Sequence, residues 1–159
     1  MNIIVCVKQV PDTASERTLR PDDGTIDRDT SDGLINELDE YAIEEGPQID
    51  EADGVEVTIL TMGPEKAVES IRKALSMGAD NAVHLLDDAL AGSDALATSS
   101  AIAKVLETTG SDLVVCGSES THTRTGVLAA MLAERLGVPQ LTLTPKVGID
   151  GTGTTHPAS

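Results

Sequence analysis

Short apolar runs alternate with helical patterns along this chain, and that alternation limits the folds open to it. Strand-like runs lie at residues 3–7, 55–60, 82–86, 113–116 and 141–147. Segments with the 3.6-residue period of an amphipathic helix lie between them, at 37–45, 64–77, 94–106 and 124–136. This order predicts an α/β fold, with a mostly parallel sheet of about five strands and helices on both of its faces.

The ends of these strands indicate where a ligand would bind. In doubly wound sheets, ligands bind beyond the carboxyl ends of the strands, at the point where the strand order reverses. If the five strands follow the order 3-2-1-4-5, this crevice lies between the first and the fourth strand. Residues 6–10, at the end of the first strand, would then lie beside residues 117–126, which follow the fourth.

The segment 117–126, Gly-Ser-Glu-Ser-Thr-His-Thr-Arg-Thr-Gly, has the composition of a phosphate-binding loop. It separates a buried strand from a predicted helix N-terminus, whose unpaired N–H groups and dipole favour an anion. Its five hydroxyl groups and Arg124 supply further donors for phosphate oxygens. Because Glu119 would repel a phosphate, we expect its side chain to turn away.

Several side chains around this crevice allow two interpretations. Arg124 either binds phosphate or is a surface arginine, and Lys8 either binds phosphate or covers a strand end. Met62 is either a wall of an adenine pocket or part of the core. The acidic helix at 37–45 is either a solvated surface or a helix whose start, capped by Asn36, faces the crevice.

Two segments interrupt the alternation. Residues 18–27 contain a Pro-Asp-Asp-Gly turn between two short extended pieces, which predicts a hairpin excursion. Gly46 and Pro47 follow the acidic helix, and a proline inside a helix costs about 3 kcal/mol or more. We therefore expect this helix to end near Glu45.

The chain carries 27 acidic residues and 11 basic ones, a net charge of −16 spread along 159 residues. Charge of this sign excludes nucleic acid as a partner, because phosphate backbones need a basic face. A dispersed acidic excess suits a cytoplasm of very high salt, where the Debye length falls below about 3 Å, and so predicts a halophile's protein. No apolar run approaches the ~20 residues of a transmembrane segment and no signal peptide is recognisable, so a cytoplasmic location is expected.

The sequence shows no catalytic or metal-binding pattern. Cys6 and Cys116 lie in apolar runs and are expected to be small buried hydrophobes; a disulfide would need an oxidising compartment, which nothing in the sequence indicates. The three histidines show no ligand spacing with each other or with the cysteines. The serines and the histidine of the 117–126 loop lack an oriented base and an oxyanion hole, so no hydrolase is predicted.

Five short segments, in order along nearly the whole chain, resemble the β subunit of electron transfer flavoproteins. They are Val5-Cys-Val-Lys-Gln-Val-Pro-Asp12, Asn36-Glu-Leu-Asp-Glu-Tyr-Ala-Ile-Glu-Glu45, Arg72-Lys-Ala-Leu-Ser-Met-Gly-Ala-Asp80, the loop from Gly117 to Gly126, and Gly137-Val-Pro-Gln140. The second is similar to the family's Asn-Pro-x-Asp-Glu-x-Ala-x-Glu-Glu block. Each segment alone is weak, but five in the right order are specific.

The resemblance implies a Rossmann-like fold related to universal stress proteins, and the role of an electron carrier subunit rather than an enzyme. In that family the β subunit forms a heterodimer with an α subunit that makes most of the contacts with FAD. The β subunit holds AMP in many members and a second FAD in electron-bifurcating members. The pair carries electrons from acyl-CoA and other dehydrogenases, as in fatty acid oxidation, to a membrane quinone reductase of the respiratory chain.

Carried over by position, the family's nucleotide contacts fall on residues that flank the predicted crevice. Together with Lys8, the expected cofactor-binding residues are Cys6, Asn36, Glu37, Leu38, Asp39, Met62, Gly117, Ser118, Glu119, Ser120, Thr121, His122, Thr123, Arg124, Thr125 and Gly126. Thr13 and Leu38 match positions where some members place aromatic rings against the α subunit's flavin. Neither residue is aromatic here, so the sequence does not predict ring stacking from them.

The chain departs from the family pattern in length. Family members continue with later strands, a dehydrogenase-recognition loop and a C-terminal arm, so this haloarchaeal-like chain is expected to be a C-terminally truncated form. We expect a nucleotide-binding α/β domain over residues 1–147 and an irregular tail over 148–159. The alternative is a stand-alone ATP- or AMP-binding module similar to universal stress proteins, which usually act as homodimers. Such modules carry more glycines in the phosphate loop and lack the Asn-x-x-Asp-Glu block.

Overall fold

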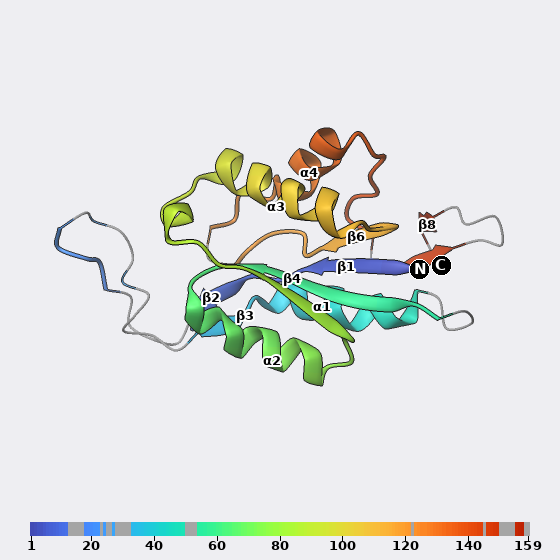
Figure 1. Ribbon diagram of the computed structural model, residues 1–159, viewed down its shortest axis with the longest axis horizontal. Helices are drawn as coiled ribbons and strands as arrows, with labels where there is room; N and C mark the ends of the chain where they lie inside the picture. Colours follow the sequence, from blue (N-terminus) through green and yellow to red (C-terminus); the bar gives the residue numbers. More distant parts are fainter. Residues whose placement is uncertain are drawn as a thin grey trace.

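A four-stranded parallel sheet forms the centre of the computed structural model (Figure 1). The structure describes residues 1–12, 18–22, 24, 27, 33–49, 54–121, 123–144, 146–149 and 155–157. The strands of the sheet are β1 (Asn2–Cys6), β4 (Glu56–Met62), β5 (Asn81–Leu85) and β6 (Leu113–Cys116), in the spatial order β5-β4-β1-β6. This arrangement confirms the predicted α/β fold and, for its first four strands, the predicted order.

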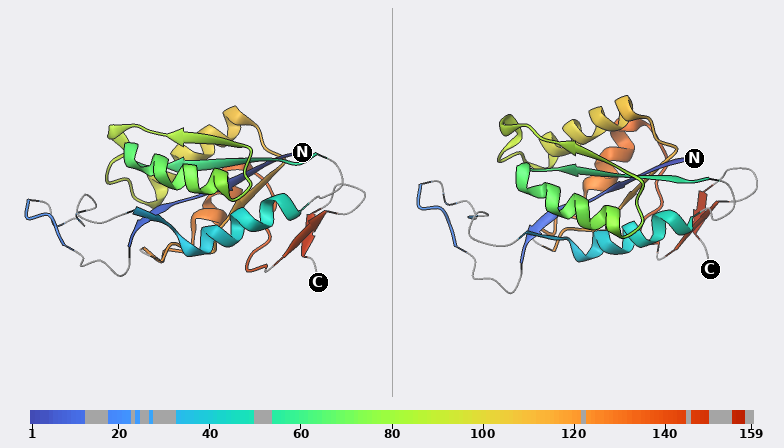
Figure 2. Two further views of the ribbon diagram at one scale, coloured as in Figure 1. Left: turned by 90° about the horizontal axis from the view of Figure 1, so that it is seen from below. Right: turned by 60° about the horizontal axis from the view of Figure 1, so that its bottom comes forward.

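Helices cover both faces of this sheet, as Figures 1 and 2 show. Helices α1 (Glu37–Glu45) and α2 (Val68–Ser76) lie side by side on one face. Helices α3 (Ala95–Thr109) and α4 (Leu128–Leu136) lie on the other. The described residues also include three single turns of 3-10 helix: η1 (Gly46–Gln48), η2 (Glu65–Ala67) and η3 (Asp88–Leu90).

The side-chain alternation of β1 divides the core into two layers, because successive residues of a strand point to opposite faces. Ile3, Val5 and Val7 belong to the cluster that packs with α1 and α2. Ile4 and Cys6 belong to the cluster that packs with α3 and α4. All five side chains are at most 7% exposed, so β1 is buried on both faces, as a central parallel strand must be.

Local sequence signals predicted several helix ends within one residue, although α2 begins at Val68 rather than Pro64 and α3 ends at Thr109 rather than Leu106. Helix α1 ends at Glu45 as expected, and Pro47 lies in the 3-10 turn that follows. The side chain of Asp94 accepts a hydrogen bond from the backbone N–H of Ala97 (2.8 Å) and so caps α3. Gly137 ends α4 in the left-handed conformation, with φ of 66°.

Helix α4 begins later than predicted. The hydrophobic pattern indicated a start at Arg124, but the first helical residue is Leu128. Arg124 and Gly126 have φ values of 49° and 60°, in the left-handed region, and therefore cannot belong to a right-handed helical turn. Arg124 thus lies four residues before the start of α4, and the predicted phosphate loop ends at Gly126, two residues before Leu128.

The predicted fifth strand, at residues 141–147, is not part of the sheet. Its described residues up to 146 form no strand, and Leu143 is left-handed, with φ of 52°. Pro145, within the same segment, cannot donate to a strand ladder. Instead β7 (Val147–Ile149) pairs in antiparallel register with β8 (Thr155–Pro157), two strands that fall largely within the range expected to be an irregular tail.

A second two-stranded ribbon lies at the carboxyl end of β1. Strand β2 (Gln9–Pro11) pairs in antiparallel register with β3 (Gly33–Ile35), and sequence analysis did not predict either strand. The predicted excursion at 18–27 extends from this end of the molecule (Figure 1). In its described part, the N–H of Asp27 donates to the carbonyl of Thr18 (2.9 Å), which closes the expected hairpin turn.

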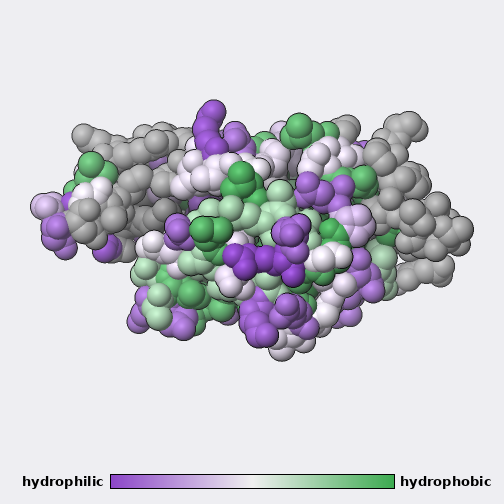
Figure 3. Space-filling model, turned by 90° about the horizontal axis from the view of Figure 1, so that it is seen from above, coloured by the Kyte–Doolittle hydropathy of each residue, from purple (hydrophilic) through white to green (hydrophobic). Residues whose placement is uncertain are grey.

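Hydrophilic residues are spread over the α3–α4 face rather than gathered in one patch, as the space-filling view shows (Figure 3). This distribution matches an acidic excess that runs along the whole sequence. Among the described residues, no helix combines the length and the apolar character needed to cross a membrane.

Candidate functional site

The carboxyl ends of β1 and β6 meet the start of α1 at one point. In parallel register, Cys6 of β1 pairs with Cys116 of β6, so the segments that follow the two strands leave the sheet side by side. The backbone N–H of Asn36, the residue before α1, donates to the carbonyl of Lys8 (3.0 Å). The start of α1 therefore lies against the segments that follow the two strands.

Asn36 joins the α1 start to the loop after β6. Its side chain is 1% exposed; Nδ2 donates to the carbonyl of Glu119 (2.9 Å), and Oδ1 accepts from the N–H of Thr121 (2.9 Å). The prediction that this side chain caps the helix is wrong, because it makes no capping hydrogen bond. Its side-chain amide bonds to the loop after β6. At the helix start, the backbone carbonyl of Asn36 accepts a hydrogen bond from the N–H of Asp39 (2.9 Å).

Asp39 joins the same α1 start to the segment after β1. Oδ2 accepts a hydrogen bond from the backbone N–H of Lys8 (2.8 Å), and Oδ1 accepts from Nδ2 of Asn36 (3.0 Å). Burial raises the pKa of Asp39 to about 6, against the opposing effect of its hydrogen bonds to Lys8, Asn36 and Gly117 and of the Lys8 charge. The carboxyl group is therefore a buried centre that holds three chain segments together.

Gly117 lets the two strand ends approach α1 this closely. A Cβ atom placed on it would lie 2.2 Å from Oδ1 of Asp39 and 3.0 Å from the carbonyl carbon and oxygen of Leu38. Any side chain at this position would displace the Asp39 carboxyl. The sequence signalled Gly117 as the end of a strand, but its close contact with α1 could be seen only in three dimensions.

Lys8 extends from the first strand to the loop after the fourth. Its Nζ donates to Oγ1 of Thr123 (3.2 Å), which places the ammonium group at the predicted phosphate loop. Within the loop, the backbone N–H of Arg124 donates to the carbonyl of Ser120 (2.8 Å). Because the N–H groups of Thr121 and Arg124 already have partners, a phosphate would be held by Lys8, by hydroxyl groups and by other amides of the loop.

The other residues predicted to bind the cofactor differ in how deeply they are buried. Met62 ends β4 and packs against the apolar cluster under α3 and α4, which favours its interpretation as core. The exposed positions are Glu37 on α1 and, in the loop, Ser118, Thr123, Arg124, Thr125 and Gly126. Leu38 is half-buried on α1. His122 and Thr13 lie outside the described residues, so the predictions for them stay predictions.

Comparison with protein-family models identifies the family of this chain. The model described as the electron transfer flavoprotein domain matches residues 23–158, which include the α1 start and the loop after β6. The chain belongs to the electron transfer flavoprotein family. The resemblance seen in five short segments is thereby confirmed.

Individual relatives with curated names agree with this assignment. Electron transfer flavoprotein subunit beta of Mycobacterium tuberculosis is 54% identical over 156 residues, which cover 94% of this chain and 59% of the relative. The protein of the same name from Clostridium acetobutylicum is 42% identical over 151 residues, 95% of this chain and 58% of the relative. Protein FixA of Sinorhizobium fredii is 45% identical over 152 residues, 92% of this chain and 53% of the relative. The chain thus spans rather more than half the length of these relatives.

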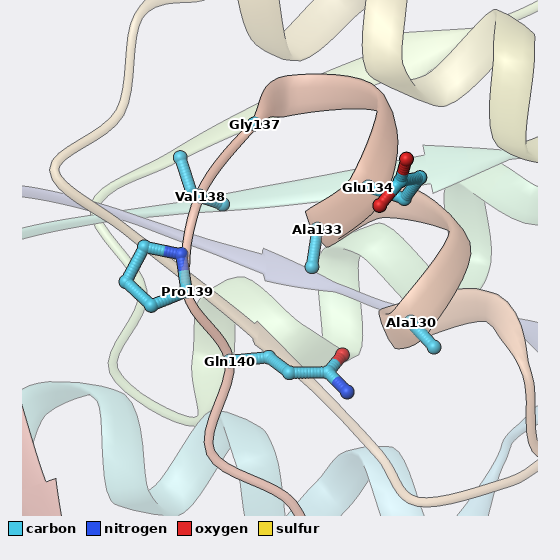
Figure 4. Close-up of a pocket in the computed structure, with 7 residues that line it drawn as sticks. All are labelled: Ala130, Ala133, Glu134, Gly137, Val138, Pro139 and Gln140. Atoms are coloured by element: carbon cyan, nitrogen blue, oxygen red, sulfur yellow. The ribbon is translucent and has the colours of Figure 1, made fainter.

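Two cavities border helix α4 of this electron transfer flavoprotein domain. One, of about 490 Å³, lies at the end of α4 and is lined by Ala130, Ala133, Glu134, Gly137, Val138, Pro139 and Gln140 (Figure 4). It touches none of the predicted nucleotide-binding residues. The other, of about 270 Å³, is lined by Cys116, Gly117, Ser118 and Gly126 together with Ala129, Ala130 and residues 141–143. The smaller cavity is the better candidate for a ligand, because the predicted loop forms one side of it.

Cys116 is a site residue that sequence analysis missed. It lines the smaller cavity and pairs in register with Cys6, yet only Cys6 was predicted to contact a nucleotide. The available signal was positional: each cysteine lies at the carboxyl end of a strand, and the supposed strand order made those strands neighbours. Within the described part of the chain, no three His, Cys, Asp or Glu side chains gather as metal ligands would.

Proposed function

We propose that this chain is the nucleotide-binding part of an electron transfer flavoprotein β subunit, and that it binds AMP between Lys8 and the 117–126 loop. The observation that carries the proposal is the joining of three segments by Asn36 and Asp39. Their hydrogen bonds fix the loop after β6 against Lys8 and the α1 start. Binding geometry that exists before the ligand arrives lowers the entropic cost of binding.

The donors around this loop fit a phosphate group. Lys8 supplies a cation, and Thr123 supplies a hydroxyl within hydrogen-bonding distance of it. Arg124 and the other loop hydroxyls are exposed or half-buried and add further donors. The one acidic side chain of the loop, Glu119, is expected to turn away from the phosphate, while its backbone carbonyl is bonded to Asn36.

We propose AMP rather than a second FAD because the cavity beside the loop, which is lined by Cys116, Gly117, Ser118 and Gly126 but not by Lys8, is limited in size. About 270 Å³ is near the lower end of small-molecule sites, which range from roughly 300 to 1,000 Å³, and so favours a mononucleotide. The chain contributes no catalytic constellation among its described residues. Its role in the proposed complex is to hold the nucleotide and to orient an α subunit that carries FAD, which supplies the redox chemistry when bound.

The proposed partners follow from the family, and the proposed location follows from the charge of the chain. We infer a heterodimer with an electron transfer flavoprotein α subunit, which accepts electrons from dehydrogenases such as acyl-CoA dehydrogenases and passes them to a quinone reductase. The names of the mycobacterial and clostridial relatives, which specify the β subunit, support this inference. We also infer a cytoplasmic location in a high-salt cell from the dispersed acidic excess.

Co-expression with an α subunit from a halophilic source tests the proposal. We expect a yellow complex at high salt that contains one copy of each chain and releases AMP on denaturation. A matched Asn36→Ala variant should release less AMP. A colourless chain that purifies as a homodimer with ATP would contradict the carrier role and would favour a universal-stress-like module.

A further inference from the structure

The chain has two cysteines, and the fold places them together beside the 117–126 loop. Cys6 is the last residue of β1 and Cys116 the last of β6, and the two are register partners in parallel strands. Register partners project to the same face of a sheet. Both belong to the apolar cluster under α3 and α4, and both are free thiols.

We propose that Cys6 and Cys116 form a reversible disulfide by exchange with a low-molecular-weight disulfide. Neighbouring strands lie about 4.7–4.9 Å apart, within the roughly 4.4–6.8 Å that separates the Cα atoms of disulfide-bonded cysteines. The backbone therefore does not have to move far for the bond to form. The inference does not rest on the proposed nucleotide function, although Cys116 lines the cavity beside the same loop.

The different surroundings of the two thiols set the order of the exchange. Cys116 is half-buried and lines the cavity of about 270 Å³, so a small reagent can reach its sulfur. Cys6 is only 7% exposed. The hydrogen bond between the two thiols, burial, and the charges of Cys116 and Asp39 all raise the pKa of Cys6, so it reacts poorly with external reagents.

The chemistry proceeds in two balanced steps. First, the Cys116 thiolate attacks one sulfur of the small disulfide, forms a mixed disulfide and releases one small thiol. Then the Cys6 sulfur attacks the Cys116 sulfur, and the second small thiol leaves. The protein loses two electrons and two protons, and the small disulfide gains them as two thiols. The new bond joins the carboxyl ends of β1 and β6.

Equilibration of the full chain with mixtures of 2-mercaptoethanol and its disulfide tests the inference. Because the chain has only two cysteines, a monomer that loses two hydrogens by mass must contain the Cys6–Cys116 bond. We expect the equilibrium constant for this bond to be at least about tenfold larger in the folded protein than in urea, since a preformed pair favours closure. No nucleotide is added, so the result does not depend on AMP binding.

Variants that replace one cysteine at a time distinguish the roles of the two thiols. In folded Cys6→Ser, Cys116 should stop at the mixed disulfide, because the second thiol is missing. In folded Cys116→Ser, Cys6 should stay unmodified. Equal equilibrium constants in the folded and unfolded wild type would overturn the inference, as would disulfide-linked dimers or a stable mixed disulfide as its main product.

Discussion

Gly117 and the carboxyl group of Asp39 lie so close that no side chain fits between them. A Cβ atom at Gly117 would be 2.2 Å from Oδ1 of Asp39. The strand end and the helix start therefore depend on each other: the glycine admits the carboxyl, and the carboxyl accepts hydrogen bonds from Lys8 and Asn36. This relationship makes the junction between β6 and α1 the structural centre of the proposed nucleotide site.

Replacement of Gly117 by alanine should break this junction. We expect Gly117→Ala to lower the free energy of unfolding by roughly 1–3 kcal/mol, because the Asp39 carboxyl is buried and cannot move without losing its hydrogen bonds. Urea denaturation at high salt measures the change. Gly46→Ala is the matched control, because a Cβ atom there meets its nearest neighbours, the side chains of Val5 and Val57, at an ordinary 3.4 Å. If the two variants unfold at the same urea concentration, the close contact between Gly117 and Asp39 does not contribute to the stability of the fold.

Removal of the Asn36 amide should destabilise the protein more than removal of an exposed amide. Asn36→Ala leaves the N–H of the half-buried Thr121 and the carbonyl of the half-buried Glu119 without their partner, and an unpaired group costs up to about 1–3 kcal/mol where water cannot replace the bond. The control is Asn81→Ala, which removes an exposed side chain bonded to Glu56 and should change the stability by less than about 0.5 kcal/mol. Equal losses in the two variants would show that Asn36 does not hold the loop.

The sequence was sufficient for the framework of the fold but not for this junction. Apolar runs and helical periods identified four strands, because burial on both faces leaves a clear pattern, and the order supposed for them agrees with the structure. The Asn36 side chain was mistaken for a helix cap because capping depends on neighbouring backbone N–H groups, whereas its partners are the Asp39 side chain and two backbone groups 83 and 85 residues away. The start of α4 was misplaced because the left-handed conformation of Arg124 is set by the loop and not by its own preference.

The buried Asp39 carboxyl should make stability depend on pH. Its pKa is about 6 in the folded chain against 3.8 for an ordinary aspartate, so between these values the folded state binds more protons than the unfolded state. Its contribution to stability is therefore fully present below about pH 4 and decreases as the pH rises to about 6. The whole change is at most about 3 kcal/mol.

Comparison with Asp39→Asn isolates this effect from the other acidic groups. The wild type should lose stability relative to the variant as the pH rises from about 4 to 6.5, measured by urea denaturation at fixed salt. A difference between the two proteins that stays constant across this range would contradict a raised pKa for Asp39.

The acidic excess should make the protein more stable at high salt. With 27 acidic and 11 basic residues, self-repulsion is strong when the Debye length is about 10 Å, at 0.1 M salt, and weak when it is about 3 Å, at 1 M. We expect the thermal midpoint to rise with KCl concentration. A variant with the exposed residues Glu44, Glu69 and Glu134 changed to lysine should show a smaller rise. Equal salt responses would rule out self-repulsion as the cause.

Calorimetric titration of the full chain with AMP at high salt tests the proposed nucleotide site most directly. We predict one AMP per chain, with an affinity that falls about tenfold in Lys8→Met, because a charge-assisted hydrogen bond to phosphate is lost. Lys104→Met should bind like the wild type, since Lys104 lies on the exposed side of α3 beside Glu107. Absence of AMP binding to the wild type, or equal affinity in all three proteins, would contradict a phosphate site formed by Lys8 and the 117–126 loop.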